Sequence, residues 1–194
     1  MTLIDQATAS LPLFLFAVHF GDKLAGLLSI AFQVLRLPAL LIGQAVSQVA
    51  FERAARLRDD PAEMRILVRR IMAILFVVGM IPVILILPFG PFLFKLVFGE
   101  SFLQAGEIAR ILVIGTCASI TISPLGNLPG IYERLGGHLR LAVISVVLRL
   151  TGLVAGISLS SWFWCLTLMT VGEMIAAIIF ARWSYRLIPI RNND

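Results

Sequence analysis

The sequence predicts an all-α integral membrane bundle, and three observations lead to this fold class. Of the 194 residues, 59% are apolar and only 14% are charged, with a mean hydropathy of +0.98. A soluble domain of ordinary composition carries about 25% charged residues. Apolar runs recur along the chain, each near the roughly 20 residues that cross a bilayer, and most arginines stand between them. We therefore expect a single bundle of six transmembrane helices over residues 1–194, surrounded by lipid.

The six predicted spans lie at about 7–20, 24–51, 71–94, 108–126, 139–159 and 162–185. In the third span, Pro82 predicts a kink, and Pro88 with Pro91 predicts a helix end. Residues 92–112 place charged side chains among apolar ones at helical spacing, which indicates a segment in the headgroup region. The fourth span should end where residues 127–130 break the helix. The uncharged Ser160-Ser161 turn should join the last two spans into a hairpin.

The basic residues between the spans predict the orientation of the chain. Residues 52–70, expected to form short helical pieces around Asp60-Pro61, share one side with the 132–140 loop and the carboxyl-terminal tail. That side carries eleven arginines, and the other carries only Lys23, Lys95 and Arg110. Cytoplasmic loops are enriched in Lys and Arg, so we expect a multi-pass protein with both termini in the cytoplasm.

The second span carries a polar stripe that predicts a substrate-binding wall. At about 100° per residue, one helical side collects small and polar groups, and the opposite side is Ala, Leu, Ile and Val. The polar positions are Ser29, Gln33, Arg36, Gly43, Gln44 and Ser47. Arg36 lies near mid-depth with no acid at matching depth on the first span, which favours lining a wet cavity over an interhelical contact. Gln44 and Gln48 suit interhelical hydrogen bonding or gripping sugar hydroxyls equally well.

Arg149 and Glu173 form a second candidate site in the last two spans. They stand eleven residues before Ser160 and twelve after Ser161, so both should reach similar depth in the hairpin. One interpretation is an ion pair that locks the hairpin. The other places Arg149 at a charged substrate, or Glu173 at a coupling ion or proton, in a cavity.

Several functional classes are disfavoured. The sequence has no Gly-rich phosphate loop, nucleophile elbow, HExxH or paired-carboxylate motif, so we expect no enzyme. Cys117 and Cys165 lie inside apolar runs without ligand spacing, which favours free packing cysteines and no metal or cofactor. The net charge of +5 comes from arginines at span ends, which argues against a nucleic-acid partner.

Three stretches together resemble the oligosaccharide flippase (polysaccharide biosynthesis protein) branch of the multidrug/oligosaccharidyl-lipid/polysaccharide (MOP) superfamily. They are AGLLSIAFQVLRLPALLIGQAVSQVAFERAARL, LVFGESFLQAGEIARIL and ISPLGNLPGIYERL. The positions that carry the resemblance are Gly26, Pro38, Gly43, Gln44, Gln48, Phe98-Gly99-Glu100, Ala105-Gly106 and Ser123-Pro124. The likeness covers nearly the whole chain and corresponds to the carboxyl-terminal half of a twelve- to fourteen-helix transporter.

The resemblance implies a location in the bacterial inner membrane and export of undecaprenyl-diphosphate-linked oligosaccharide for surface polysaccharide. The idea of a cationic cavity carries over to Arg36 and, more weakly, to Arg149. The first bundle of such a transporter is missing, so we expect a fragment or a half that pairs with a second six-helix bundle or with its own copy. Alternatives are half of a cation-coupled multidrug exporter, or a membrane scaffold that transports nothing.

Overall fold

The computed structural model describes residues 3–36, 57, 61–131 and 135–188, and every regular element in this part is a helix. The labelled elements are α1 (Leu3–Phe20), α3 (Pro61–Phe98), the 3-10 turn η1 (Glu100–Phe102), α4 (Leu103–Ile122), the 3-10 turn η2 (Ser123–Asn127), α5 (Leu128–Ile131), α6 (Leu135–Ser158) and α7 (Trp162–Arg186). Residues 22–36 are also helical and are called helix 22–36 below.

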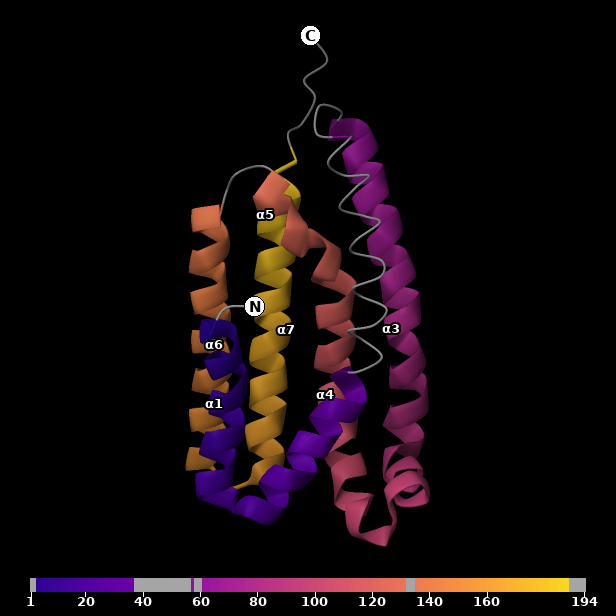
Figure 1. Ribbon diagram of the computed structural model, residues 1–194, viewed down its shortest axis with the longest axis vertical. Helices are drawn as coiled ribbons and strands as arrows, with labels where there is room; N and C mark the ends of the chain where they lie inside the picture. The colour runs from indigo at the N-terminus through magenta and orange to yellow at the C-terminus, as the bar shows by residue number, and fades with distance from the viewer. Residues whose placement is uncertain (1–2, 37–56, 58–60, 132–134, 189–194) are drawn as a thin grey trace.

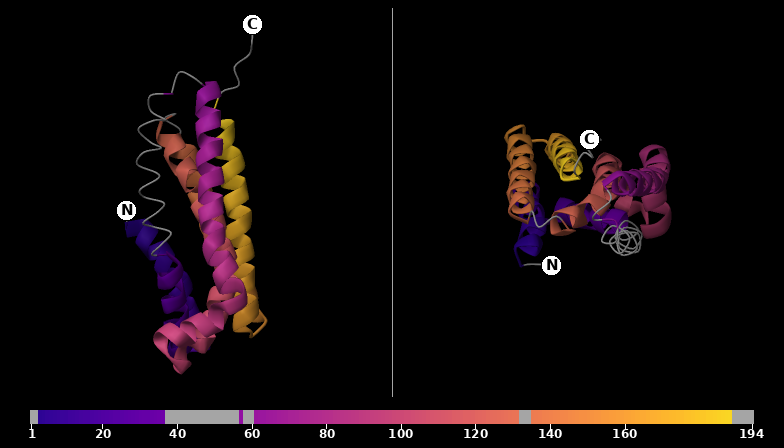
Figure 2. Two further views of the ribbon diagram at one scale, coloured as in Figure 1. Left: turned by 90° about the vertical axis from the view of Figure 1, so that its right-hand side faces the viewer. Right: turned by 90° about the horizontal axis from the view of Figure 1, so that it is seen from above.

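The long helices stand side by side in a row (Figures 1 and 2). α4 packs between α3 and α7, and α6 packs on the far side of α7. Helix 22–36 and α1 cross the lower part of this row, where α1 begins beside the middle of α6 (Figure 1). The main buried cluster therefore joins α1, helix 22–36, α3, α4, α6 and α7 near one end of the bundle.

Four helical stretches are long and apolar enough to cross a membrane: Ala62–Phe98, Glu100–Gly130, Gly136–Ser158 and Trp162–Arg186. They match the third to sixth predicted spans. The first two predicted spans are not among the four, and residues 37–51 of the second lie outside the described residues. The all-helical membrane bundle is confirmed at this level, and the count of six spans stays a prediction.

The predicted end of the third span at Pro88 and Pro91 is wrong. α3 continues through both prolines to Phe98, and Figure 2 shows its lower end bending away from the axis of the rest. A proline removes one backbone donor and kinks a helix, but a neighbouring helix can supply another donor. Arg110 of α4 contacts this stretch by donating from Nη2 to the carbonyl of Pro88, whereas the carbonyls that lose their N–H partner at Pro88 and Pro91 are those of Ile84 and Leu87. The helix then stops at Gly99, whose φ of 98° suits glycine.

α3 also starts as one continuous helix. The segment before the third span was expected to form short pieces, yet residues 61–70 are unbroken helix, and residues 52–56 and 58–60 lie outside the described residues. Pro61 opens the helix, a position where the missing N–H costs nothing. Met64 and Val68 then bury one face of the first turns. At the same end of the bundle, α4 stops at Ile122, before the predicted boundary, because η2 begins with Ser123-Pro124.

The last two predicted spans match the structure closely, as α6 and α7. An added Cβ at Gly156 would overlap Cys165 Cα, and one at Gly152 would lie 2.6 Å from the Leu168 oxygen, which shows that the two backbones are in contact. Small residues at such a crossing bring two helices close in a membrane. The joining turn needs a left-handed residue at Ser160, with φ of 51°. This close hairpin fixes the depth at which α6 and α7 present their charged side chains.

Candidate functional site

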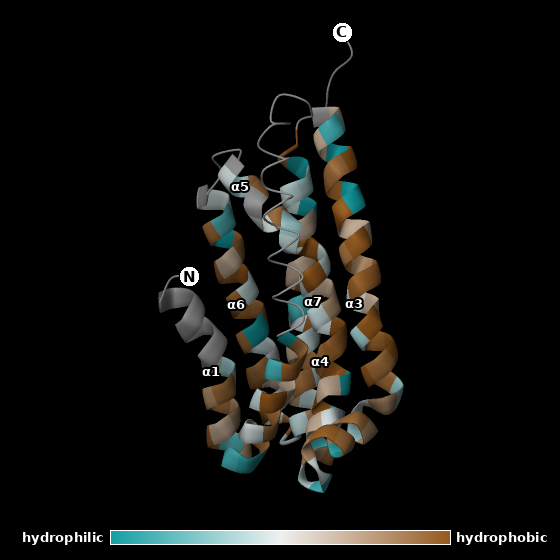
Figure 3. Cartoon of the chain, turned by 45° about the vertical axis from the view of Figure 1, so that its right-hand side comes forward, coloured by the Kyte–Doolittle hydropathy of each residue, from teal (hydrophilic) through white to brown (hydrophobic). Residues whose placement is uncertain are grey.

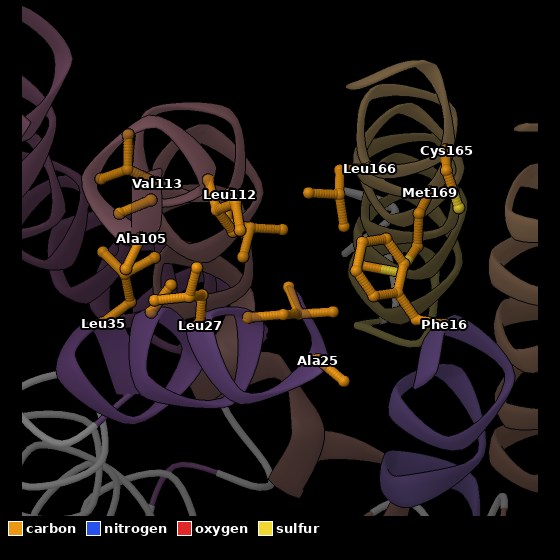
Figure 4. Close-up of a cluster of buried hydrophobic side chains, with 14 of the residues drawn as sticks. Phe16, Ala25, Leu27, Leu35, Ala105, Leu112, Val113, Cys165, Leu166 and Met169 are labelled. Atoms are coloured by element: carbon orange, nitrogen blue, oxygen red, sulfur yellow. The ribbon is translucent and has the colours of Figure 1, made fainter. Parts of the chain in front are cut away.

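Helix 22–36 buries its apolar side against the rest of the bundle. Ala25, Leu28, Ala31 and Leu35 recur at helical spacing and are each less than a tenth exposed. Figure 4 shows Leu27 and Leu35 directed toward Ala105 and Leu112 of α4. This packing follows from the apolar stripe and fixes how the helix is rotated about its axis.

The polar side of the same helix points away from that packing. Gln33 and Arg36 are exposed and Ser29 is half-buried, three and four residues apart along one face. Within the described residues, no carboxylate lies at ion-pair distance from Arg36. Gln44 and Gln48, the other predicted substrate-binding residues of this helix, lie outside the described residues. The described part of the predicted polar wall is therefore one outward face with a free guanidinium.

Arg149 and Glu173 come together as an ion pair across the α6–α7 hairpin. Arg149 Nη2 lies 3.0 Å from Glu173 Oε1, and the two side chains are 27% and 23% exposed. Of the two interpretations of these residues, the structure contains the ion pair across the hairpin. The contact leaves Arg149 Nε buried without a hydrogen bond in the described part of the chain.

Ser119 of α4 completes this site, and sequence reasoning missed it. Its hydroxyl donates to Glu173 Oε1 over 3.1 Å, the same oxygen that receives Arg149. Gly115, one turn earlier, leaves room for the carboxylate, since an added Cβ there would lie 3.3 Å from Glu173 Oε2. A small residue and a hydroxyl four positions apart on an apolar helix were a signal for this contact. The residues Ser119, Arg149 and Glu173, called the α4–α6–α7 polar joint, tie three helices together.

The two sites have different chemical capacities. The face of helix 22–36 offers five guanidinium donors and an amide, which suit a phosphate and hydroxyl groups. The polar joint holds a carboxylate already satisfied by a cation and a hydroxyl, which suits structural pairing or exchange with a competing ion. The structure does not bring Arg36 and Arg149 together, because they lie on elements at different places in the row (Figure 1).

A comparison with protein families gives one match. A family model described as polysaccharide biosynthesis protein covers residues 1–107, more than half of the chain. The chain belongs to the polysaccharide biosynthesis protein family. It matches no curated protein and no solved structure.

The matched part of this polysaccharide biosynthesis protein contains helix 22–36 and all of α3, but not the polar joint, whose three residues follow residue 107. The family and the four membrane-length helices together identify a multi-pass membrane protein associated with polysaccharide biosynthesis. Among the two sites, only the face of helix 22–36 lies within the region that carries the family match.

Proposed function

We propose that the protein translocates undecaprenyl-diphosphate-linked oligosaccharide across the bacterial inner membrane, as the carboxyl-terminal half of a MOP-type flippase. No bond is made or broken, so the protein acts as a transporter and not as an enzyme. Its work is to lower the barrier for moving a charged headgroup and its sugars through hydrocarbon. Both termini face the cytoplasm in this proposal.

The observation that carries the proposal is the outward polar face of helix 22–36. A guanidinium at the centre of a membrane helix costs about 3 kcal/mol on insertion scales if it faces lipid. Arg36 is exposed on the face opposite the buried apolar stripe, beside Gln33 on the same side. Water or a second protein surface covering this face removes that cost, and a diphosphate bound there replaces its own lost hydration with charge-assisted hydrogen bonds.

This arrangement calls for a second bundle. One face cannot enclose a headgroup, so a further six-helix half, or a second copy of this chain, would supply the opposite wall of the cavity. The polar joint is the proposed place of ion coupling, since a proton or cation at Glu173 would compete with Arg149 for the same oxygen. Weakening that contact would loosen α6 from α4 and α7 as the cavity changes its open side.

The test is complementation of a flippase-deficient strain by the full chain, expressed with its partner half where one is encoded. Arg36→Ala should abolish surface polysaccharide while the protein still inserts, because the headgroup loses its cationic contact. Arg36→Lys should retain a part, since it keeps the charge without the fork geometry. Lys23→Ala, which removes an exposed charge at the far end of the same helix, is the matched control.

Other outcomes point to the remaining functions. Full complementation by Arg36→Ala counts against the cavity role. A scaffold would cross-link to a partner in native membranes and tolerate Arg36→Ala. A multidrug exporter half would confer resistance to organic cations that depends on Glu173 and not on Arg36.

A further inference from the structure

The two ends of the bundle differ strongly in charge. Around the start of α3, the start of α6 and the end of α7, the described residues hold six arginines and one carboxylate, Glu63. The six are Arg65, Arg69, Arg70, Arg140, Arg182 and Arg186. The opposite end is balanced, with the cations Lys23, Lys95 and Arg110 and the anions Asp22, Glu100 and Glu107. Figure 3 shows hydrophilic turns at the upper ends of α3 and α7 above a hydrophobic middle.

Two of the six arginines are held in place where α3 meets the end of α7. Arg65 Nη2 donates to the carbonyl of Ile188 over 3.0 Å, and its guanidinium carbon lies 5.8 Å from the centroid of the Tyr185 ring. Arg69 Nη2 lies 3.4 Å from the Tyr185 hydroxyl. We call Arg65, Arg69 and Tyr185 the α3–α7 clamp. It presents two guanidinium groups one helical turn apart.

The clamp rests on a rigid apolar base. Met64, Val68, Leu125, Leu128 and Ile188 form a buried cluster directly beneath it, each less than a tenth exposed. This base joins α3, η2, α5 and the end of α7. Anchoring on a packed cluster lowers the conformational entropy that the arginines lose when they bind a ligand.

Most of the donors of the clamp have no partner among residues 3–36, 57, 61–131 and 135–188. A guanidinium has five N–H donors, and with the described residues each of the two arginines forms one hydrogen bond. No carboxylate lies within ion-pair distance of either arginine in the described part of the chain. Arg65 Nε is buried and makes no hydrogen bond there, and the same holds for Oγ of the fully buried Ser184, one turn before Ile188.

We propose that the α3–α7 clamp binds the phosphate of an anionic phospholipid headgroup. Paired guanidinium forks match the oxygens of a phosphate, and Tyr185 holds both arginines on the same side. From the clamp toward the middle of the bundle, α3 leaves Ile74 exposed, where the acyl chains of the same lipid would lie. The choice of a phospholipid rests on the proposed orientation, because anionic lipids line the cytoplasmic leaflet.

The test measures lipid retention by the full chain. The protein is reconstituted in nanodiscs of phosphatidylcholine with a minor fraction of phosphatidylglycerol, and the lipids it retains are counted by native mass spectrometry. The wild type should retain phosphatidylglycerol in preference to phosphatidylcholine. Arg65→Gln with Arg69→Gln should lower this retention about tenfold or more, because two charge-assisted contacts are lost.

Two comparisons separate a built site from a general positive field. Arg140→Gln with Arg182→Gln removes the same charge from the same end and should lower retention less than about threefold. Arg69→Gln alone keeps the Arg65 contact with Ile188, so it preserves the fold and should still lower retention about fivefold.

Equal losses in the two double variants, or no preference for phosphatidylglycerol in the wild type, would overturn the proposal. Displacement of phosphatidylglycerol by undecaprenyl diphosphate at equal concentration would assign the clamp to the transported lipid and overturn it too. The readout is binding and not translocation, so a failure of the Arg36 complementation test leaves this result standing.

Discussion

Arg149 and Glu173 show how an ion pair inside a membrane bundle is made tolerable. Each charge alone would carry a desolvation cost of several kcal/mol, which Coulomb attraction offsets only with good geometry and further hydrogen bonds. The 3.0 Å contact and the Ser119 hydroxyl supply both for the carboxylate. Removing one partner should therefore cost more than removing the pair.

A double-mutant cycle tests this coupling. Arg149→Met and Glu173→Met should each lower the free energy of unfolding by about 3 kcal/mol, because a partly buried charge is left without its partner. The double variant should lose less than either single variant, which corresponds to a coupling energy of about 3 kcal/mol or more. Denaturation in detergent measures the four proteins, and Arg140→Met, at an exposed position of the same helix, is the control. Strictly additive losses would contradict the pairing.

The contacts of some site residues could be predicted from the sequence, and those of others could not. Counting from the Ser160-Ser161 turn was enough to bring Arg149 and Glu173 to the same depth, since the hairpin is short and regular. Ser119 was missed because its partner sits on another helix 54 positions away, and helical periodicity says nothing about distant elements. The polar stripe on helix 22–36 predicted which face of the helix is polar and which is apolar, but it did not predict what covers the polar face.

The α6–α7 hairpin depends on glycines that admit a close crossing. Gly156→Ala should destabilise the protein by about 1–3 kcal/mol, because the new methyl group would overlap Cys165 and push the helices apart. Gly136→Ala in the same helix meets open space and should be neutral or stabilising by up to about 1 kcal/mol. Thermal unfolding in detergent, followed through the α7 tryptophans, compares the two. Equal shifts in both variants would mean that the hairpin is not in backbone contact.

The helices were predicted best where nothing but apolar length decides them. α6 and α7 follow largely apolar runs that contain no proline and are separated by a short turn, so their bounds agree with the expectation. The end of α3 was predicted wrongly because Pro88 and Pro91 were expected to end the helix, as prolines usually do in soluble proteins. α3 nevertheless continues through Pro88 and Pro91 to Phe98, and a side chain of another helix, Arg110, donates to the Pro88 carbonyl in this stretch. That donor stands on α4, outside any local pattern.

The whole bundle combines one arginine-rich end and one end of balanced charge with an apolar middle. α3 has 38 residues and is about 57 Å long, against the roughly 30 Å of the hydrocarbon core, so its arginine-bearing start extends into the headgroup region. Composition alone predicted this membrane class. The sequence could not say whether α1 and helix 22–36 complete the crossing count, because their depth depends on packing against α4 and α7.

The charge difference between the ends predicts the orientation, which reporter fusions can test. Fusions after residue 188 should be active for a cytoplasmic reporter, because the arginine-rich end stays on the side of synthesis. Fusions in the turns at Gly99 and Ser160, at the opposite end of the bundle, should be active only for a periplasmic reporter. Replacing Arg65, Arg69 and Arg70 by Gln should weaken this bias, while replacing Lys23 and Lys95 should leave it intact. A periplasmic signal after residue 188 would show that the bundle has the opposite orientation. The α3–α7 clamp would then lie outside the anionic cytoplasmic leaflet, while the helix packing would be the same.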